Sequence, residues 1–343
     1  MAKATMHRIK LMVNKIKLFR RSPYFVNVGI FAAAFAVIGG ATLLLSSAAT
    51  TKVIYEAESS NVSGSLAVLA DNDASGGSYV EFGVESPGWN GYEKPGANNT
   101  GPTNRNNLTN VTNSQLEDMM TDGAVIENVN ITGGDVDIVA NNVTIRNFVL
   151  NANGNRYGFV SRTNKTGLTL EDGEIYNMSS ASILGMGFTA RRLNIHDSGG
   201  DGIKAQSTGS VSGPVLVESS WIHRLGKNDG AHADGDQSRS GPSPIVFRGN
   251  NCDMPVNEKG GPGAPYKSNA CFILAEAEGP LVSFTAEYNW LNGGNFTVYC
   301  GGEGSNNYFR YNRFGRGYRY GTRSGTCDVW EGNVWDDNEE AVN

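Results

Sequence analysis

The sequence predicts an all-β protein whose larger part is a solenoid of stacked parallel coils. The 343 residues include 44 glycines and only 18% charged residues, a composition typical of turn-rich β structure. From residue 124 onward, an eight-residue pattern with strand periodicity recurs nine times. The charge at the fourth position of this pattern changes sign from each copy to the next. A repeat of twenty or more residues with strand periodicity is typical of a solenoid.

The repeat has the order apolar, any, apolar, charged, polar, any, any, apolar. Its copies begin at residues 124, 143, 168, 188, 215, 245, 284, 307 and 328. Equivalent positions of successive coils stack about 4.8 Å apart in a parallel β-helix, so opposite charges are expected to alternate along one column. That column reads Glu127, Arg146, Glu171, Arg191, Glu218, Arg248, Glu287, Arg310 and Glu331. The sixth position predicts a hydrogen-bonded amide column of Asn250, Asn289, Asn312 and Asn333.

The first 49 residues have the anatomy of an export segment. Residues 1–27 carry seven Lys/Arg and no acidic residue, residues 28–45 are apolar, and small residues follow at 46–49. Two outcomes stay open, a cleaved signal peptide or an uncleaved transmembrane anchor with its basic end inside. In both cases the body of the protein is expected to be secreted or to lie at the cell surface.

The four cysteines fit an oxidising compartment. None has C-x-x-C spacing, so a zinc site is not expected. We predict the disulfides Cys252–Cys271 and Cys300–Cys327, the pairing that closes the shorter loops.

The charge distribution constrains the partners of the protein. The net charge is −6, and without the basic residues of the export segment it is −13. Nucleic acid is therefore not an expected partner, because neutralisation of phosphates dominates that kind of binding. An acidic body suits calcium, whose ligands are oxygens.

Five stretches of the solenoid carry a resemblance to a known group. They are KPGANNTGP (94–102), GDGIKA (200–205), HADGDQ (232–237), GGNFTVYCGG (293–302) and WEGNVWDD (330–337). They resemble secreted right-handed parallel β-helix proteins of the pectate-lyase-like superfamily, over roughly residues 92–338. The resemblance implies a right-handed helix of three-stranded coils. It does not imply one activity, since the superfamily contains lyases, hydrolases, epimerases and proteins without known activity.

A shorter upstream segment, residues 55–83, resembles the opening strands of a carbohydrate-binding β-sandwich of the family 6/35 type. In such modules acidic residues at the positions of Glu56 and Glu58 can hold a structural calcium. The segment is too short for a complete sandwich. We therefore expect an export segment (1–49), a short sandwich-like remnant with a linker (50–91), and a right-handed parallel β-helix (92–343).

Polar residues concentrate in the three successive long coils that begin at residues 188, 215 and 245. Aligning the second strands of these coils predicts that Asp201 lies beside Asp234 and Lys204 beside Gln237. The insertion 225–233 is then expected to bulge out just before Asp234, with His232 reaching in from it.

Two more histidines lie in the same coils. His196 and His223 occupy the ninth position of consecutive repeats, so their rings are expected to stack. Two imidazolium ions at that distance would repel each other, so the pair is not expected to carry two full charges near neutral pH. Their spacing does not suit a transition-metal site.

Three functions follow from these residues. The first is β-elimination on an acidic, uronic-acid polysaccharide, with Lys204 or His232 as base and calcium on Asp201, Asp234 and Asp236. The second is glycoside hydrolysis by the carboxylate pair Asp201 and Asp234. The third is non-catalytic glycan binding or cell-surface adhesion, aided by the Tyr/Arg-rich loop 313–323. The candidate catalytic residues are His196, Asp201, Lys204, His223, His232, Asp234 and Gln237.

The first hypothesis is an exported polysaccharide lyase, with the hydrolase and the adhesin as alternatives. We expect a monomer whose partner is an extracellular polysaccharide. Membrane contact is expected only through an uncleaved N-terminal segment.

Overall fold

The computed structural model describes residues 66–70, 78–82, 90–161, 164–207, 212–254, 256, 266–275, 279–301 and 306–343. The chain divides into two compact units, Met1–Phe82 and Gly83–Asn343. In the first unit, β1 (Leu66–Ala70) and β2 (Ser78–Phe82) form an antiparallel pair. The predicted export segment, Glu56 and Glu58 lie outside the described residues. No helix among the described residues is long and apolar enough to cross a membrane.

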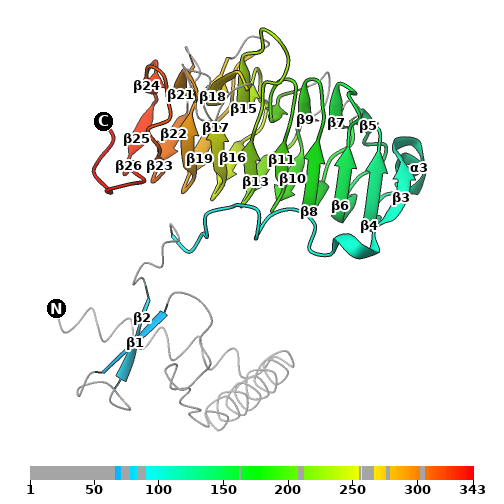
Figure 1. Cartoon of the computed structure of the whole chain (residues 1–343), viewed down its shortest axis with the longest axis horizontal. Coiled ribbons are helices and arrows are strands. Elements are labelled where there is room, and N and C mark those ends of the chain that lie inside the picture. Colours follow the sequence, from blue (N-terminus) through cyan, green and yellow to red (C-terminus); the bar gives the residue numbers. More distant parts are fainter. Residues whose placement is uncertain are drawn as a thin grey trace, which may run out of the picture. The chain divides into compact units, whose positions relative to one another are not determined.

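The second unit is a parallel β-helix, and the predicted fold class is confirmed (Figure 1). Its larger, 16-stranded sheet contains β3 (Thr109–Thr112), β4 (Val125–Thr132), β6 (Thr144–Asn151) and β8 (Leu168–Tyr176), and beyond β8 it divides into two arms. The first arm comprises β10 (Phe188–Arg191), β13 (Val215–Glu218), β16 (Ile245–Arg248), β19 (Phe284–Glu287), β22 (Asn307–Arg310) and β25 (Val329–Glu331). The second arm comprises β11 (Asn194–His196), β14 (Trp221–His223), β17 (Asn251–Met254), β20 (Trp290–Gly293), β23 (Arg313–Phe314) and β26 (Val334–Trp335).

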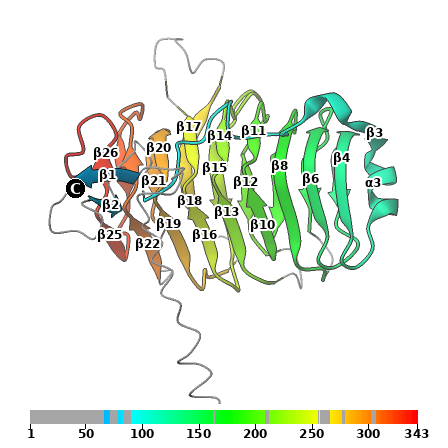
Figure 2. The ribbon, with the colours of Figure 1, turned by 90° about the horizontal axis from the view of Figure 1, so that it is seen from below.

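The smaller, eight-stranded sheet receives one strand from each of the first eight of the nine coils (Figure 2). It comprises β5 (Val136–Asp137), β7 (Tyr157–Val160), β9 (Ala181–Gly185), β12 (Ile203–Ala205), β15 (Ala233–Ser238), β18 (Ser268–Leu274), β21 (Phe296–Tyr299) and β24 (Gly321–Ser324). The described helical elements are the 3-10 turn η3 (Arg105–Asn107) and α3 (Asn113–Met119). Residues Thr112 and Gln115 form a capping box at the start of α3, near the N-terminal end of the solenoid.

The charge column has the predicted register in all nine coils. Each acidic residue of the column pairs with an arginine of the neighbouring coil, from Glu127 opposite Arg146 to Arg310 opposite Glu331. Arg191, for example, lies 3.3 Å from Glu171 and 3.1 Å from Glu218. Pairs as exposed as these contribute less than about 1 kcal/mol each, so the column favours one register more than it adds stability.

The fifth position of the repeat bends each coil at the same point. All nine residues there have a left-handed backbone, with φ between 50° and 62°: Asn128, Asn147, Asp172, Arg192, Ser219, Gly249, Tyr288, Tyr311 and Gly332. At Gly249 a side chain would also collide with the Tyr92 ring, so glycine meets two requirements there. This column of turns separates the two arms of the larger sheet.

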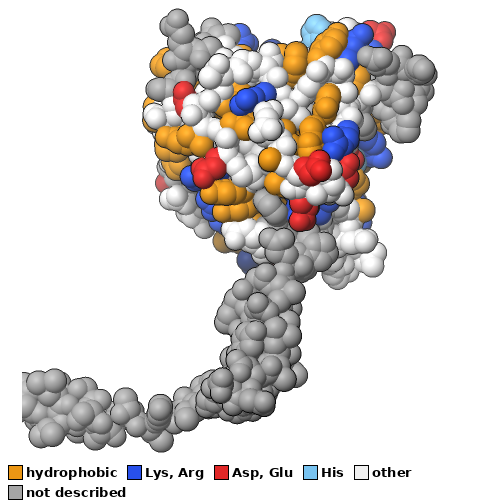
Figure 3. Space-filling view, turned by 90° about the vertical axis from the view of Figure 1, so that its left-hand side faces the viewer, with side chains coloured by type: hydrophobic (Ala, Val, Ile, Leu, Met, Phe, Trp, Pro, Cys, Tyr) orange, Lys and Arg blue, Asp and Glu red, His pale blue; other side chains and the backbone are white. Residues whose placement is uncertain are grey.

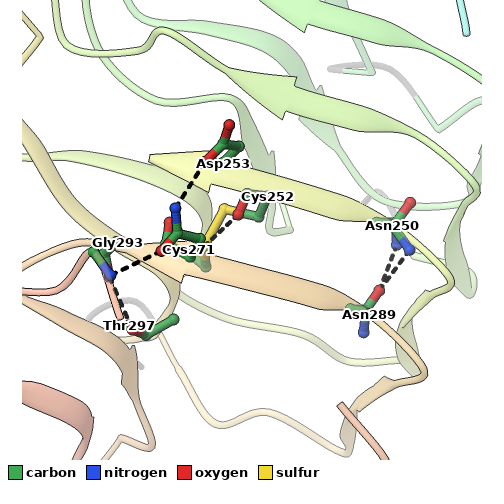
Figure 4. Close-up of a disulfide and its surroundings, with 9 residues drawn as sticks. Asn250, Cys252, Asp253, Cys271, Asn289, Gly293 and Thr297 are labelled. Carbon is green, nitrogen blue, oxygen red and sulfur yellow. Dashed lines mark hydrogen bonds between the residues drawn. A yellow bond between two sulfur atoms is a disulfide. The ribbon is translucent and has the colours of Figure 1, made fainter. Parts of the chain in front are cut away.

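The predicted amide column is confirmed. Asn250 donates to Asn289 (3.0 Å), Asn289 to Asn312 (2.9 Å) and Asn312 to Asn333 (3.0 Å), each through Nδ2 to Oδ1. Each of these three Nδ2 groups also donates to a backbone carbonyl one coil away in the opposite direction. Figure 4 shows the first of these pairs. The buried amides thus satisfy one another and the backbone along the solenoid axis.

The core and the disulfides lie inside the stacked coils. Phe247, Phe272, Phe284 and Phe309 pack ring against ring along the axis, with centroids 5.0–6.4 Å apart. Both predicted disulfides, Cys252–Cys271 (Figure 4) and Cys300–Cys327, are present. Two disulfides indicate an oxidising environment for this unit.

The last coil is closed by Trp330, which packs on Phe314 and donates its indole N–H to the Val342 carbonyl at 2.7 Å. In Figure 3, which faces this end, apolar side chains are interspersed with acidic and basic ones.

Candidate functional site

The candidate site lies on the outer face of the smaller sheet, where β12, β15, β18 and β21 follow one another. Parallel pairing places Gln237 opposite Ile273 and Ile273 opposite Tyr299. A bulge between Ala233 and Asp234 shifts the register at the start of β15, immediately after the insertion that was predicted to bulge out.

A cavity of about 400 Å³ opens on this face. Its described lining residues are His232, Asp234, Gln237, Asn269, Ile273, Asn295 and Tyr299. The lining is polar and rich in amides, with one aliphatic and one aromatic side chain. Its volume falls within the range of small-molecule sites.

Asp234 is the most unusual of these residues. Its Oδ1 accepts a hydrogen bond from Asn269 Nδ2 at 2.9 Å, whereas its buried Oδ2 has no hydrogen-bond partner among the described residues. Burial, together with the nearby charge of Asp201, raises the pKa of Asp234 well above its usual value. The shift favours the neutral form of Asp234 relative to an exposed aspartate, and a neutral carboxyl group is an acid and a hydrogen-bond donor.

The two contacts predicted between neighbouring coils, Asp201 with Asp234 and Lys204 with Gln237, are present. Lys204 Nζ lies 2.6 Å from Asp201 Oδ2 and donates to Gln237 Oε1 at 2.8 Å. Asp201 Oδ1 accepts the backbone N–H of Asp234 at 2.9 Å. Both oxygens of Asp201 are therefore engaged, and neither Asp201 nor Lys204 is among the described residues that line the cavity. This geometry makes Lys204 a support for Gln237, and its catalytic role stays a prediction.

Asp236 points into the solenoid, in contrast to Asp234. It is fully buried between Ile203 and Phe272 in the strand register, and it accepts hydrogen bonds from the Ala205 amide (3.0 Å) and Ser238 Oγ (2.7 Å). Burial raises the pKa of Asp236 to about 7.

The predicted calcium ligands Asp201, Asp234 and Asp236 thus do not converge. In the described part of the chain, no group of three or more His, Cys, Asp or Glu residues is placed to hold a metal ion. Calcium binding remains a prediction.

His196 and His223 stack as predicted, with ring centroids 5.3 Å apart, but they lie on the second arm of the larger sheet. Neither is among the described residues that line the cavity. Burial, the charge of His196 and that of Arg224 lower the pKa of His223 to about 3, so His223 is neutral near neutral pH. The expectation that the pair does not carry two charges therefore agrees with the structure.

His196 belongs to an ionic network that joins several elements. Its ring nitrogens lie 2.7 Å from Asp197 Oδ2 and 2.9 Å from Glu174 Oε1. Burial opposes ionisation of both acids, but hydrogen bonds from His196 outweigh it, aided by Tyr266 at Asp197 and by Arg105 at Glu174. The pKa of each acid falls to about 2.

Asp197 also anchors the insertion that precedes Asp234. Arg224 donates to Asp197 Oδ2 at 2.6 Å, and Lys227 lies 3.5 Å from its Oδ1. Tyr266, just before β18, donates to the same Oδ1 at 2.9 Å. The contacts of Arg224 and Lys227 hold the start of the insertion against the solenoid. The network therefore supports the insertion that carries His232.

Sequence reasoning did not identify Asn269, Ile273 and Asn295 as site residues. They occupy, in the two coils after β15, positions beside those of Asp234 and Gln237. Extending the alignment of the second strands of the coils by two further coils would have placed these three residues beside the candidate site.

The fold and the cavity define a parallel β-helix protein with an amide-rich cavity and, on the outer face of one sheet, a buried aspartate whose pKa is raised. Comparisons of the chain with protein-family models, with curated proteins and with solved structures gave no match.

Proposed function

We propose that the protein is an exported polysaccharide lyase, related to the pectate-lyase-like superfamily, that cleaves a uronic-acid polysaccharide by β-elimination. The observation that carries this proposal is Asp234, a buried carboxyl group on the cavity wall with a raised pKa and an unpartnered Oδ2. The two disulfides and the basic-apolar start of the chain support export.

β-Elimination removes the proton beside the sugar carboxylate, so negative charge builds up on that carboxylate. An ionised aspartate in the cavity would repel it, whereas a neutral Asp234 donates a hydrogen bond to it. A carboxylic acid kept neutral by its surroundings is an effective donor to developing negative charge. The side-chain N–H groups of Gln237 and Asn295 supply further donors at the cavity wall.

His232 and Tyr299 complete the proton transfers. His232 is exposed at the rim of the cavity and accepts the proton from the carbon beside the carboxylate. A carbon–carbon double bond then forms as the glycosidic carbon–oxygen bond breaks. Burial raises the pKa of Tyr299, so its phenol keeps a proton and donates it to the leaving oxygen.

The geometry favours this reaction over hydrolysis by a carboxylate pair. Asp201 would have to activate a water molecule, but both of its oxygens are already engaged and it does not line the described cavity. A pair in which only Asp234 reaches the cavity lacks the base that hydrolysis needs.

The test is to incubate the purified protein with pectic, alginate and glycosaminoglycan uronans and to follow the ultraviolet absorbance of the unsaturated product. We expect turnover by the wild type and a loss of about a hundredfold or more in D234N and Y299F, typical of lost acid catalysis or charge stabilisation. D118N, on exposed α3, and Y308F, on the larger sheet, are matched controls. New reducing ends without the ultraviolet absorbance would show that the protein is a hydrolase and not a lyase. Binding without either product would show that it is a glycan-binding protein without catalytic activity.

A further inference from the structure

One column of side chains continues from the cavity toward the C-terminal end of the solenoid. Asn269 Nδ2 donates to Asp234, Asn295 Nδ2 donates to Asn269 Oδ1 at 3.2 Å, and the Tyr320 amide donates to the Asn295 carbonyl at 2.7 Å. The column thus crosses three coil steps, roughly 14 Å at the usual spacing of β-strands. This length exceeds one sugar ring and matches a short stretch of polymer laid along the solenoid axis.

The column ends in an aromatic and cationic platform formed by Phe296, Arg319 and Tyr320. Tyr320 is 61% exposed, and its ring centroid lies 5.6 Å from that of Phe296. The Arg319 guanidinium lies 5.1 Å from the centre of the Tyr320 ring. Phe296 in turn packs edge-on against Tyr299 of the cavity wall, 5.5 Å between centroids. The platform is therefore continuous with the cavity.

We propose that this platform is a second binding subsite, which holds a uronate residue of the same polysaccharide chain several sugars away from the bond that is cleaved. An exposed aromatic ring offers a flat apolar surface to the apolar face of a sugar ring. The positive charge of the adjacent guanidinium attracts a sugar carboxylate. The described cavity lining contains no lysine or arginine, so the platform supplies the fixed positive charge that an acidic polymer needs.

The subsite makes affinity depend on chain length. A long oligosaccharide engages the cavity and the platform together, and its second contact is intramolecular. A disaccharide is shorter than the column of roughly 14 Å, so one that is bound beside Asp234 is expected to engage the cavity without the platform. The substrate class rests on the proposed function, but binding at the subsite does not require that the polysaccharide is cleaved.

The experiment measures binding of saturated oligouronates to the full chain by calorimetry, with disaccharides compared with octasaccharides. In R319A/Y320A we expect the Kd of the octasaccharide to rise about tenfold and the Kd of the disaccharide to stay unchanged. Y308A removes a partly exposed tyrosine beside Arg310 on the larger sheet and should change neither Kd.

Equal weakening for both lengths, or no weakening for the octasaccharide, would overturn the subsite. The lyase and the subsite can be refuted separately. A protein that binds long oligouronates through Tyr320 but releases no unsaturated product would refute the proposed lyase activity and leave the proposed subsite standing. A protein that cleaves uronans with unchanged kinetics in R319A/Y320A keeps the lyase and loses the subsite.

Discussion

Replacing the buried Asp236 by asparagine should make the protein less sensitive to alkaline pH. The Asp236 side chain is fully buried, and its two oxygens accept hydrogen bonds from the Ala205 amide and Ser238 Oγ. Asparagine keeps the shape, accepts the Ala205 N–H through Oδ1, and donates to Ser238 Oγ through Nδ2. The substitution therefore removes the charge while it preserves the packing.

The magnitude follows from the pKa of Asp236, which rises from 3.8 to about 7 on folding. Because the folded pKa is raised, the folded state binds more protons than the unfolded state between these values, and stability falls as pH rises through about 7. At 1.36 kcal/mol per pKa unit the full effect is about 4 kcal/mol. Between about pH 5 and about pH 8.5 it amounts to roughly 2–3 kcal/mol, since the unfolded aspartate is already ionised at pH 5.

Urea unfolding followed by circular dichroism at both pH values measures this difference. Relative to the wild type, the free energy of unfolding of D236N should gain roughly 2–3 kcal/mol on going from the lower to the higher pH. Asp234 is present in both proteins, but the charge of Asp236 contributes to its raised pKa, so D236N also reduces the Asp234 contribution, in the same direction. The exposed variant D118N should follow the wild type. If D236N and the wild type change in parallel with pH, then Asp236 is not a buried titrating group and the reasoning is refuted.

Two further predictions concern the amide column and the ionic network. N289A should lower the free energy of unfolding by about 3–5 kcal/mol, because it removes the acceptor of the Asn250 backbone N–H and of one Asn250 Nδ2–H, and the donor to the Phe247 carbonyl. The exposed N106A should change it little, and urea titration of both variants decides this. His223 has a folded pKa of about 3, below its unfolded value of 6.5, so stability is present above pH 6.5 and is lost as pH falls. From about pH 6.5 to 4.5 the wild type should lose about 2 kcal/mol more than H223Q, and an equal loss in both would show that His223 is not held neutral by the fold.

The sequence determined the coils and their register. The alternating charges from Glu127 to Glu331 and the column from Asn250 to Asn333 depend on which positions stack, and a repeat with strand periodicity determines that directly. The approach of Lys204 to Gln237 followed from the same alignment. These contacts lie between equivalent positions of neighbouring coils, so counting residues was sufficient.

The tertiary structure decided which polar side chains share a cavity. Asp234 and Asp236 are two residues apart, yet Asp234 lines the cavity whereas Asp236 lies in register with the buried Ile203 and Phe272, a difference that strict strand alternation does not predict. His196 and His223 stack on the other sheet, where Glu174, Asp197 and Arg224 surround them. Only packing around each side chain determines its burial and its pKa, because desolvation depends on neighbours from distant coils. A repeat pattern therefore predicts which residues are adjacent, but not which of them meet solvent, a substrate or one another.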